Sequence, residues 1–226
     1  MPELPILFSD EQLLVVNKPA GLPTLPDGYQ PEAPCLINLL GAEFGRVWVV
    51  HRLDKDTSGV IVLARSAEAH RALNMAFDSR AVRKVYHALV VGLPEWDERT
   101  IDLSLRPDGD RRHRTLIDRQ RGKPAVTHCR VLERFPDYAL VEARPETGRT
   151  HQIRAHLAAI GLPLAGDALY GGKIIGDVIN RSALHARSIQ FEHPATKVML
   201  KFTADYQADF KTALAELRQA NTHSTP

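Results

Sequence analysis

Cysteine is scarce in this chain, and the features of export and of membrane insertion are missing. The 226 residues include two cysteines, Cys35 and Cys129, which are too few for a disulfide framework and lack the spacing of metal ligands. The N-terminal segment has no basic stretch followed by a long apolar run, so it does not resemble a signal peptide. No apolar run approaches the roughly 20 residues that a membrane-spanning helix needs. These absences predict a reduced, cytoplasmic protein.

Charge of one sign is not in excess either. The formal net charge is +2, and the pI of about 8.6 lies below the value of about 9 that is typical of nucleic-acid-binding domains. The charge is unevenly distributed, because residues 1–50 carry −4 and leave +6 for residues 51–226. The stretch from Arg106 to Lys123 holds seven Lys and Arg residues against three Asp. It is either a solvated surface loop or a loop that contacts phosphates.

The glycine-rich signatures of nucleotide cofactors are also absent. The chain contains neither G-x-G-x-x-G nor G-x-x-x-x-G-K-[ST]. His151 and His156 are five residues apart, so they do not share a helical face as the i, i+4 pair of a zinc hydrolase does. We therefore expect neither a cofactor nor a bound metal.

Short runs rich in β-branched and aromatic residues predict strands along most of the chain. The last run alternates, with Val198, Leu200 and Phe202 on one face. Many strands and few helices, without regular βαβ alternation, predict an α+β fold with a mixed sheet. The predicted strands are Leu13–Val16, Val47–Val50, Val60–Ala64, Val85–Val91, Val126–Leu132, Tyr138–Ala143 and Val198–Thr203.

Three helices are expected. Ser66 is a suitable cap for a helix that runs through Phe77. Thr150 is a suitable cap for a second helix, which buries Ile153, Leu157 and Ile160 and ends at Gly161. The third runs from Tyr206 to about Gln219 and buries Tyr206, Phe210, Leu214 and Leu217. We expect one domain over residues 1–220 and a disordered polar tail over residues 221–226.

A polar segment, HRLDKDTSG (residues 51–59), lies between two predicted strands. It combines two bases, two acids and two hydroxyls, which are costly to place between buried strands unless they pair or carry out chemistry. The alternative interpretation is a polar turn in which Asp and Ser cap the local backbone.

A second polar segment, PETGRTHQIRAH (residues 145–156), contains Arg149 just ahead of a predicted helix. Gly148 precedes it and lets the backbone approach a partner closely. An arginine in this position can pair with a carboxylate and keep it ionised. At about 4 Å such a pair is worth roughly 4 kcal/mol at an effective dielectric constant of 20, before the cost of desolvation. The histidines of this segment are alternatively polar surface residues.

Together these segments resemble those of the RluA-type family of RNA pseudouridine synthases. The similarity spans nearly the whole chain in the family's order. Some relatives carry an RNA-binding S4 domain ahead of the catalytic domain, whereas here residues 17–21 already match the family. We therefore expect the catalytic domain and its loops to recognise the RNA. The matching segments are residues 16–22 (VNKPAGL), HRLDKDTSG, residues 83–88 (RKVYHA), PETGRTHQIRAH, residues 166–171 (GDALYG), residues 184–186 (LHA) and residues 193–194 (HP).

The resemblance implies roles for individual residues. Asp54 matches the family's catalytic aspartate, Arg149 the arginine that pairs with it, and Tyr86 the tyrosine that stacks on the target base. Without the motif, Tyr86 would be read as a core strand residue. Arg52 matches an arginine that helps to displace the uridine and fills its place in the RNA. The expected substrate-binding residues are Arg52, Leu53, Thr57, His151, Ile153 and Leu184, and the expected RNA-backbone contacts are Arg111, Arg112, Arg114 and Lys123.

The resemblance also implies a fold and a reaction. The expected fold is a mixed, mostly antiparallel central sheet with flanking helices and a central RNA-binding cleft. The expected reaction is isomerisation of a uridine in a stem-loop of 23S rRNA or tRNA, which requires the base to leave its stack. No membrane or obligate protein partner is inferred, and a monomer is expected.

Two other functions compete with this prediction. A glycosidic-bond hydrolase would use the same carboxylate with a water and would release free base. A non-catalytic RNA-binding protein could retain the fold, but loss of Asp54, Tyr86 or Arg149 would then be expected, and all three are present.

Overall fold

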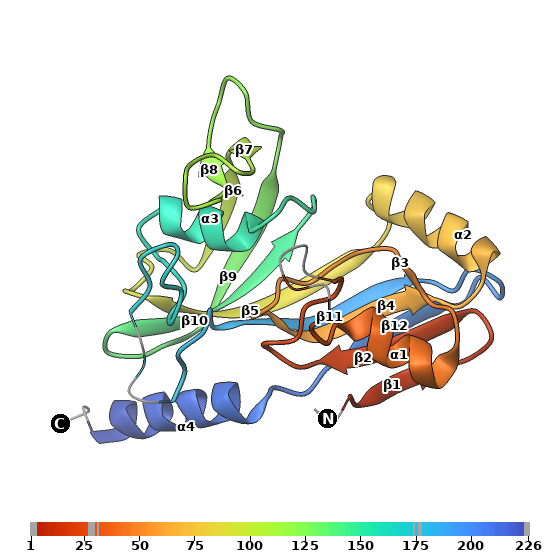
Figure 1. Ribbon diagram of the computed structural model, residues 1–226. Helices are drawn as coiled ribbons and strands as arrows, with labels where there is room; N and C mark the ends of the chain where they lie inside the picture. The colour runs from red at the N-terminus through yellow and green to blue at the C-terminus, as the bar shows by residue number, and fades with distance from the viewer. Residues whose placement is uncertain (1–3, 27–29, 31, 174, 176–177, 224–226) are drawn as a thin grey trace. The chain divides into compact units, whose positions relative to one another are not determined.

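The computed structural model describes residues 4–26, 30, 32–173, 175 and 178–223. The chain divides into two compact units. Unit 1 consists of Met1–Lys84 and Ala186–Asp205, and unit 2 of Val85–His185 and Tyr206–Pro226. The chain passes from unit 1 to unit 2 within strand β5 (Arg83–Val91) and returns within strand β11 (Leu184–Glu192) (Figure 1).

Unit 1 is built on strands that are buried on both faces. All residues of β4 and five of the six residues of β2 are buried, so these strands form nearly continuous apolar runs instead of alternating. β2 pairs antiparallel with β1 and with β4, β3 adds to β4, and β12 pairs antiparallel with β11. The elements are β1 (Ile6–Ser9), β2 (Leu13–Lys18), α1 (Leu36–Phe44), β3 (Trp48–Val49), β4 (Ser58–Ala64), α2 (Ala67–Asp78) and β12 (Met199–Thr203).

One glycine in unit 1 allows a close approach of two strands. Gly59 has φ +114°, and a Cβ atom at this position would lie 2.3 Å from the carbonyl oxygen of Ala186 in β11. Only glycine satisfies both the backbone conformation and the contact. The last residue of the HRLDKDTSG segment therefore has a packing role.

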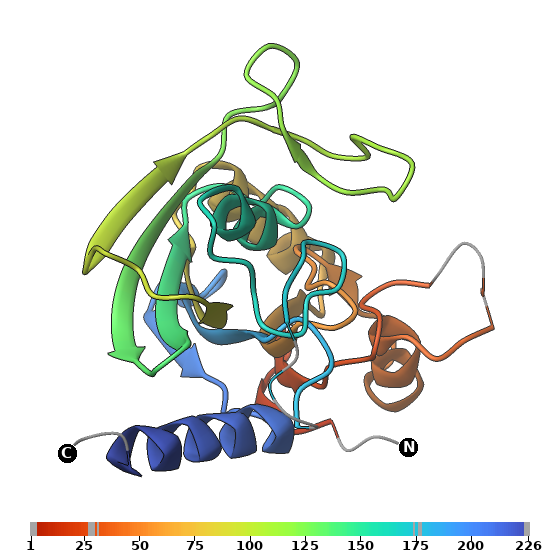
Figure 2. The same ribbon diagram turned by 90° about the vertical axis from the view of Figure 1, so that its left-hand side faces the viewer.

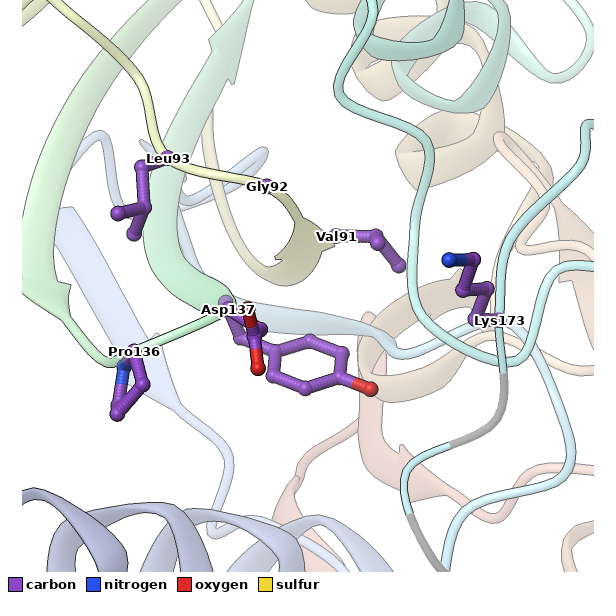
Figure 3. A pocket seen from close by; sticks show the side chains of 7 residues that line it. Val91, Gly92, Leu93, Pro136, Asp137 and Lys173 are labelled. Carbon is purple, nitrogen blue, oxygen red and sulfur yellow. The ribbon is translucent and has the colours of Figure 1, made fainter.

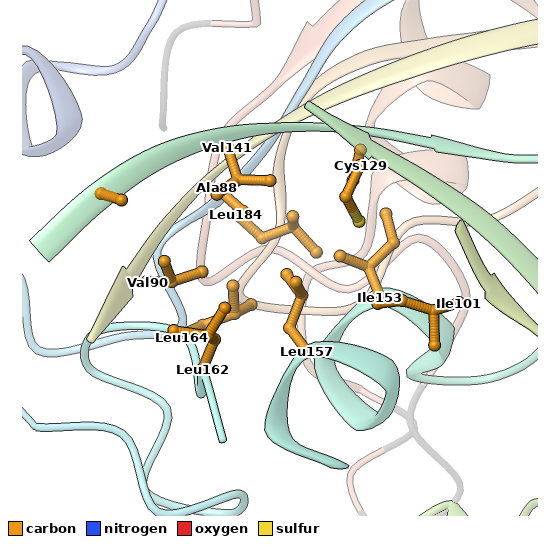
Figure 4. Packing of buried hydrophobic residues seen from close by; sticks show 12 residues of the cluster. Ala88, Val90, Ile101, Cys129, Val141, Ile153, Leu157, Leu162, Leu164 and Leu184 are labelled. Atoms are coloured by element: carbon orange, nitrogen blue, oxygen red, sulfur yellow. The ribbon is translucent and has the colours of Figure 1, made fainter. Parts of the chain in front are cut away.

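Unit 2 contains four antiparallel strands in the order β5–β10–β9–β6. Alternate residues of these strands face two different apolar clusters. Val141 of β10 lies in the cluster that includes Ile153 and Leu157 of α3 (Figure 4). Leu140 instead lies in the cluster that includes Phe210 and Leu214 of α4. The elements are β6 (Glu98–Asp102), β9 (Val126–Arg134), β10 (Tyr138–Pro145), α3 (Gln152–Ala159) and α4 (Ala208–His223).

The basic stretch found in the sequence lies between β6 and β9. It contains two short paired strands, β7 (Leu105–Arg106) and β8 (Leu116–Ile117). We call residues 105–123 the basic hairpin. Figure 2 shows this part of the chain running beyond the ends of β6 and β9.

The α+β fold and its mostly antiparallel strands are confirmed, and each predicted strand has a counterpart. Ser66 caps α2, because its Oγ accepts a hydrogen bond from the N–H of Ala69. The prediction that Thr150 caps α3 is wrong: the N-cap is His151, in the left-handed conformation with φ +51°. Val198 lies outside β12 and is exposed, so it does not share a buried face with Leu200 and Phe202.

Several elements were not expected from the sequence, namely α1, β1, β6, β7, β8 and β11. Helix α4 continues to His223, so residues 221–223 of the expected tail are helical, and residues 224–226 lie outside the described residues. Among the residues that the structure describes, no helix is both long and apolar enough to cross a membrane.

Candidate active site

The main chain on both sides of Asp54 is anchored to residues of unit 1 that precede it by about thirty positions or more. On one side, Thr24 Oγ1 donates a hydrogen bond to the carbonyl of Leu53 at 2.9 Å and accepts one from its N–H at 3.3 Å. On the other side, the carbonyl of Lys55 accepts hydrogen bonds from Lys18 Nζ at 3.1 Å and from the N–H of Gly21 at 2.9 Å. The turn closes through a hydrogen bond from the N–H of Thr57 to the carbonyl of Asp54. These hydrogen bonds fix the backbone of the loop that carries Asp54, and the Asp54 side chain is partly exposed.

Lys18 connects the segment at residues 17–21 to this loop through a buried ammonium group. Its side chain has no exposed surface, and Nζ also donates to the carbonyls of Pro19 and Leu22 at 2.9 and 2.7 Å. A buried ammonium is tolerated when its three N–H groups all find acceptors, and three carbonyls are available here. The role of this segment in unit 1 is to hold the loop that carries Asp54.

His51, at the start of the HRLDKDTSG segment, is a neutral structural residue. Its Nε2 accepts a hydrogen bond from the N–H of Val62 at 3.1 Å, and its ring stacks on Phe77 with centroids 4.8 Å apart. Burial and the nearby charge of Lys84 lower the pKa of His51 from 6.5 to about 3. Because Nε2 accepts, the proton of the neutral ring lies on Nδ1.

The other predicted site residues of unit 1 differ in accessibility. Arg52 is exposed, whereas Leu53 and Thr57 are buried. Thr57 Oγ1 has no hydrogen-bond partner among the described residues. The side chains of Leu53 and Thr57 therefore belong to the packing around the loop, and their role as substrate-binding residues stays a prediction.

In unit 2, the structure brings together three of the predicted site residues. Ile153 and Leu184 are buried in the apolar cluster between α3 and the strands (Figure 4). Tyr86 of β5 packs against the same cluster. Tyr86 is only partly buried. An aromatic ring backed by apolar side chains, with part of its surface exposed, is a suitable platform for a base.

Arg149 is held at the start of α3 by the amide of Gln152. Gln152 Oε1 accepts hydrogen bonds from the N–H of Arg149 at 3.0 Å and from Thr147 Oγ1 at 2.7 Å. Its Nε2 donates to the carbonyl of Val126 and to Thr127 Oγ1. All four hydrogen-bonding positions of this amide are therefore satisfied, which fixes the backbone that carries Arg149.

His156 extends this polar network into the core. Its Nε2 lies 2.9 Å from the carbonyl of Leu103 and must donate, so its Nδ1 accepts from Thr127 Oγ1 at 2.9 Å. Burial lowers the pKa of His156, in keeping with a neutral ring. Both ring nitrogens are thus engaged within the protein.

The GDALYG segment (residues 166–171) is tied to α3 by an ion pair and an aromatic ring. Arg154 donates two hydrogen bonds to Asp167, at 2.6 and 2.9 Å, and its guanidinium carbon lies 5.1 Å from the ring centroid of Tyr170. The hydroxyl of Tyr170 lies 3.1 Å from Nδ1 of His151. These contacts support His151 in a backbone conformation that costs roughly 1–3 kcal/mol for a residue other than glycine.

The basic hairpin contains two classes of arginine. Arg106 and Arg114 form ion pairs with Asp118 and Asp110, at 2.8 and 2.6 Å. Arg112 is exposed and reaches the carbonyl of Ala168 at 3.3 Å. Within the described ranges, no ion pair forms at Arg111, Arg112, Arg119, Arg121 or Lys123.

This division bears on the predicted RNA contacts. Arg111, Arg112 and Lys123 present exposed side chains, whereas Arg114 is bound to Asp110 and helps to shape the hairpin. Asp118 also accepts hydrogen bonds from the N–H groups of Gln120 and Arg121. The bond from Arg121 is the main reason that the pKa of Asp118 is lowered, so it stays ionised and keeps its partners.

A cavity of about 560 Å³ lies elsewhere in unit 2. It is lined by the end of β5 and the turn between β9 and β10, with Lys173 on the opposite side (Figure 3). None of the predicted site residues lines it. The cavity is therefore separate from the residues that the sequence singled out.

The predicted site residues are divided between the two units. Arg52 and Asp54 belong to unit 1, and Tyr86, Arg149 and Leu184 belong to unit 2. The pairing of Asp54 with Arg149 stays a prediction.

The sequence did not predict the residues that hold the candidate site in place, namely Lys18, Thr24, Thr147, Gln152, Arg154, Asp167 and Tyr170. Most of them lie in the matching segments, so their presence there was the available signal.

Comparison with known proteins agrees with the fold. The model of the RNA pseudouridylate synthase family matches residues 12–159. Ribosomal large subunit pseudouridine synthase D of Pseudomonas aeruginosa is 40% identical over 234 residues, which cover 96% of this chain and 72% of that protein. The uncharacterized RNA pseudouridine synthase YlyB of Bacillus subtilis is also 40% identical, over 96% of this chain and 74% of its own.

A solved structure gives the same result. The structure of human RNA pseudouridylate synthase domain containing 4 superposes with a TM-score of 0.77. It is 28% identical in sequence, and the match covers 95% of this chain and 93% of that chain. The fold and the matching residues define an isomerase that acts on RNA. The chain belongs to the RNA pseudouridylate synthase family, and its resemblance to the RluA-type members is confirmed.

Proposed function

We propose that this protein converts a uridine of large-subunit ribosomal RNA to pseudouridine, with Asp54 as the catalytic carboxylate. The observation that carries the proposal is the anchoring of the main chain on both sides of Asp54 by Thr24, Lys18 and Gly21. A catalytic group must be held within a fraction of an ångström of its working position, and a solvated polar turn would not need such anchors. The names of relatives such as the Pseudomonas aeruginosa enzyme favour ribosomal RNA.

In this proposal the reaction breaks the C1′–N1 bond of the uridine, turns the uracil and joins C1′ to C5. The C5 hydrogen leaves as a proton, and N1 takes up a proton in place of its bond to C1′. Asp54 acts either as a nucleophile or as a base that removes a ribose proton. Both routes need an ionised carboxylate, and Arg149 is the proposed partner that maintains it.

Access to the base requires its removal from the RNA stack, at a cost of a few kcal/mol. Tyr86 is proposed to stack on the extruded uracil, which would recover roughly 1–3 kcal/mol. Ile153 and Leu184 belong to the apolar cluster that supports Tyr86. Arg52 is proposed to occupy the space that the uridine leaves, because a planar guanidinium stacks between bases better than an ammonium does.

The test is tritium release from RNA labelled at C5 of uracil. Unmodified 23S rRNA and unmodified bulk tRNA are assayed separately with the wild type, Asp54→Asn and the neighbouring control Asp56→Asn. We expect release from rRNA by the wild type and the control, and RNA binding without release by Asp54→Asn. Release from tRNA alone would replace ribosomal RNA by the other substrate class that the sequence suggests. Turnover by Asp54→Asn at the wild-type rate would remove Asp54 from the mechanism.

A further inference from the structure

The hydroxyl of Tyr170 bridges two segments that are far apart in the sequence. Its oxygen accepts a hydrogen bond from the N–H of Thr115 at 2.8 Å and lies 3.3 Å from the carbonyl of the same residue. It also lies 3.1 Å from Nδ1 of His151. Thr115 directly precedes β8 of the basic hairpin, and His151 directly precedes α3. One hydroxyl therefore joins the hairpin to the start of the helix, and Figure 1 shows β8 beside α3.

The ring that carries this hydroxyl is itself fixed to α3. The guanidinium of Arg154 lies over the ring, and Asp167 holds Arg154 through two hydrogen bonds. The ring also packs on the small apolar cluster of Leu105 and Ala155. Burial raises the pKa of Tyr170, so the hydroxyl keeps its proton. Tyr170 is thus a fixed side chain that contacts both the basic hairpin and α3.

A second contact runs beside it. Thr115 Oγ1 donates a hydrogen bond to the carbonyl of Thr150 at 2.9 Å, and Thr150 follows Arg149 in the chain. A shift of Thr115 would therefore reach the residue next to Arg149. The exposed Arg111 and Arg112 precede Thr115 in the chain by four and three residues.

We infer that Tyr170 is a positioning residue, which couples the basic hairpin, with its exposed Arg111 and Arg112 as RNA-phosphate contacts, to the backbone of Arg149. The inference rests on the proposed function. When the hairpin arginines hold the RNA phosphates, the target uridine is aligned with the catalytic groups only if the hairpin stays fixed relative to the start of α3. Loosening that arrangement leaves the phosphate contacts in place and misaligns the reacting groups, so it lowers kcat more than it raises KM.

The test is Tyr170→Phe, which keeps the ring under Arg154 and removes only the hydroxyl. The control is Tyr138→Phe, which removes a hydroxyl from β10, where Tyr138 packs against the apolar cluster that includes Phe210 and Leu214. Tritium release gives kcat and KM, and filter binding at several salt concentrations gives the slope of affinity against salt. For Tyr170→Phe we expect kcat to fall about tenfold or more, KM to change less than about threefold and the salt slope to stay that of the wild type.

All assays are run below the melting temperature of each variant, so loss of folded protein does not enter kcat. An unchanged kcat would make Tyr170 a scaffold residue only and would overturn the inference. A fall in the salt slope together with kcat would also overturn it, because the hydroxyl would then be needed for binding. A wild type that releases no tritium from either RNA would instead contradict the proposed function.

Discussion

Thr24 holds the main chain of Leu53 through both of its hydrogen-bonding groups, because Oγ1 donates to the carbonyl and accepts from the N–H. The two residues are 29 positions apart, and both are buried. The hydroxyl thus takes the place of a neighbouring strand's peptide group. It holds the loop between β3 and β4 just ahead of the partly exposed Asp54. It links the segment after β2 to the loop that carries Asp54.

Removal of the Thr24 hydroxyl should therefore affect catalysis as well as stability. In Thr24→Val the side chain keeps its shape, but a buried N–H and a buried carbonyl lose their partner, which costs about 1–3 kcal/mol of folding free energy. We expect kcat to fall by about tenfold at a temperature where the variant is folded, because Asp54 is less well placed. Thr24→Ser retains the hydroxyl and should stay close to the wild type. Equal kcat values for Thr24→Val and the wild type would show that the anchor is dispensable for catalysis.

The ion pair between Arg154 and Asp167 should contribute strongly to the stability of unit 2. The two side chains are 10% and 1% exposed, so removal of one partner leaves an uncompensated buried charge. Asp167→Asn should lower the free energy of unfolding by about 3 kcal/mol, measured by urea denaturation. The matched control is Glu68→Gln, which breaks an exposed pair with Arg71 and should cost less than about 1 kcal/mol. Similar losses in the two variants would argue against a buried pair.

The exposed arginines of the basic hairpin should set the salt dependence of RNA binding. Each phosphate contact that is lost reduces the slope of log affinity against log salt by about 0.7–0.9. Arg111→Ala combined with Arg112→Ala should therefore reduce the slope by about 1.4–1.8. The charge-matched control, Arg71→Ala combined with Lys211→Ala, removes two charges from α2 and α4 and should leave the slope unchanged. A slope that is insensitive to the hairpin variant would return the hairpin to the class of solvated surface loops.

His51 should make the protein less stable in mild acid. Its folded-state pKa of about 3 lies below the ordinary value of 6.5, so the unfolded chain binds a proton that the folded chain does not. Stability is therefore fully present above pH 6.5 and falls as the pH drops toward 3, by at most about 1.4 kcal/mol per pH unit.

The comparison variant is His51→Gln, which can still accept the hydrogen bond from the N–H of Val62 but does not titrate. Urea denaturation between pH 7 and pH 4.5 should show a steeper loss of stability in the wild type than in this variant. Carboxylates titrate in both proteins, so the difference between the two curves isolates His51. Parallel curves would contradict a neutral His51 in the folded protein.

The sequence predicted well those features that depend on neighbouring residues. The Ser66 cap, the strand at Val60–Ala64 and the helix that buries Ile153 and Leu157 all follow from local patterns. The cap of α3 was predicted wrongly at Thr150. The local pattern cannot reveal that the hydroxyl of Tyr170, nineteen residues away, supports His151 in a left-handed conformation.

The sequence by itself determined the family, the α+β fold class and the two polar segments. Each motif and each periodic pattern can be read from a short stretch of chain, and the order of the motifs can be read along it. Only the tertiary structure decided which polar residues hold the site. Thr24 anchors Leu53, Asp167 binds Arg154, and Arg114 is bound to Asp110 within the hairpin that was expected to offer it to RNA. The physical reason is that a hydrogen bond or an ion pair depends on distances of about 3 Å in the folded chain, and such distances between remote residues are set only by the packing of the strands and helices.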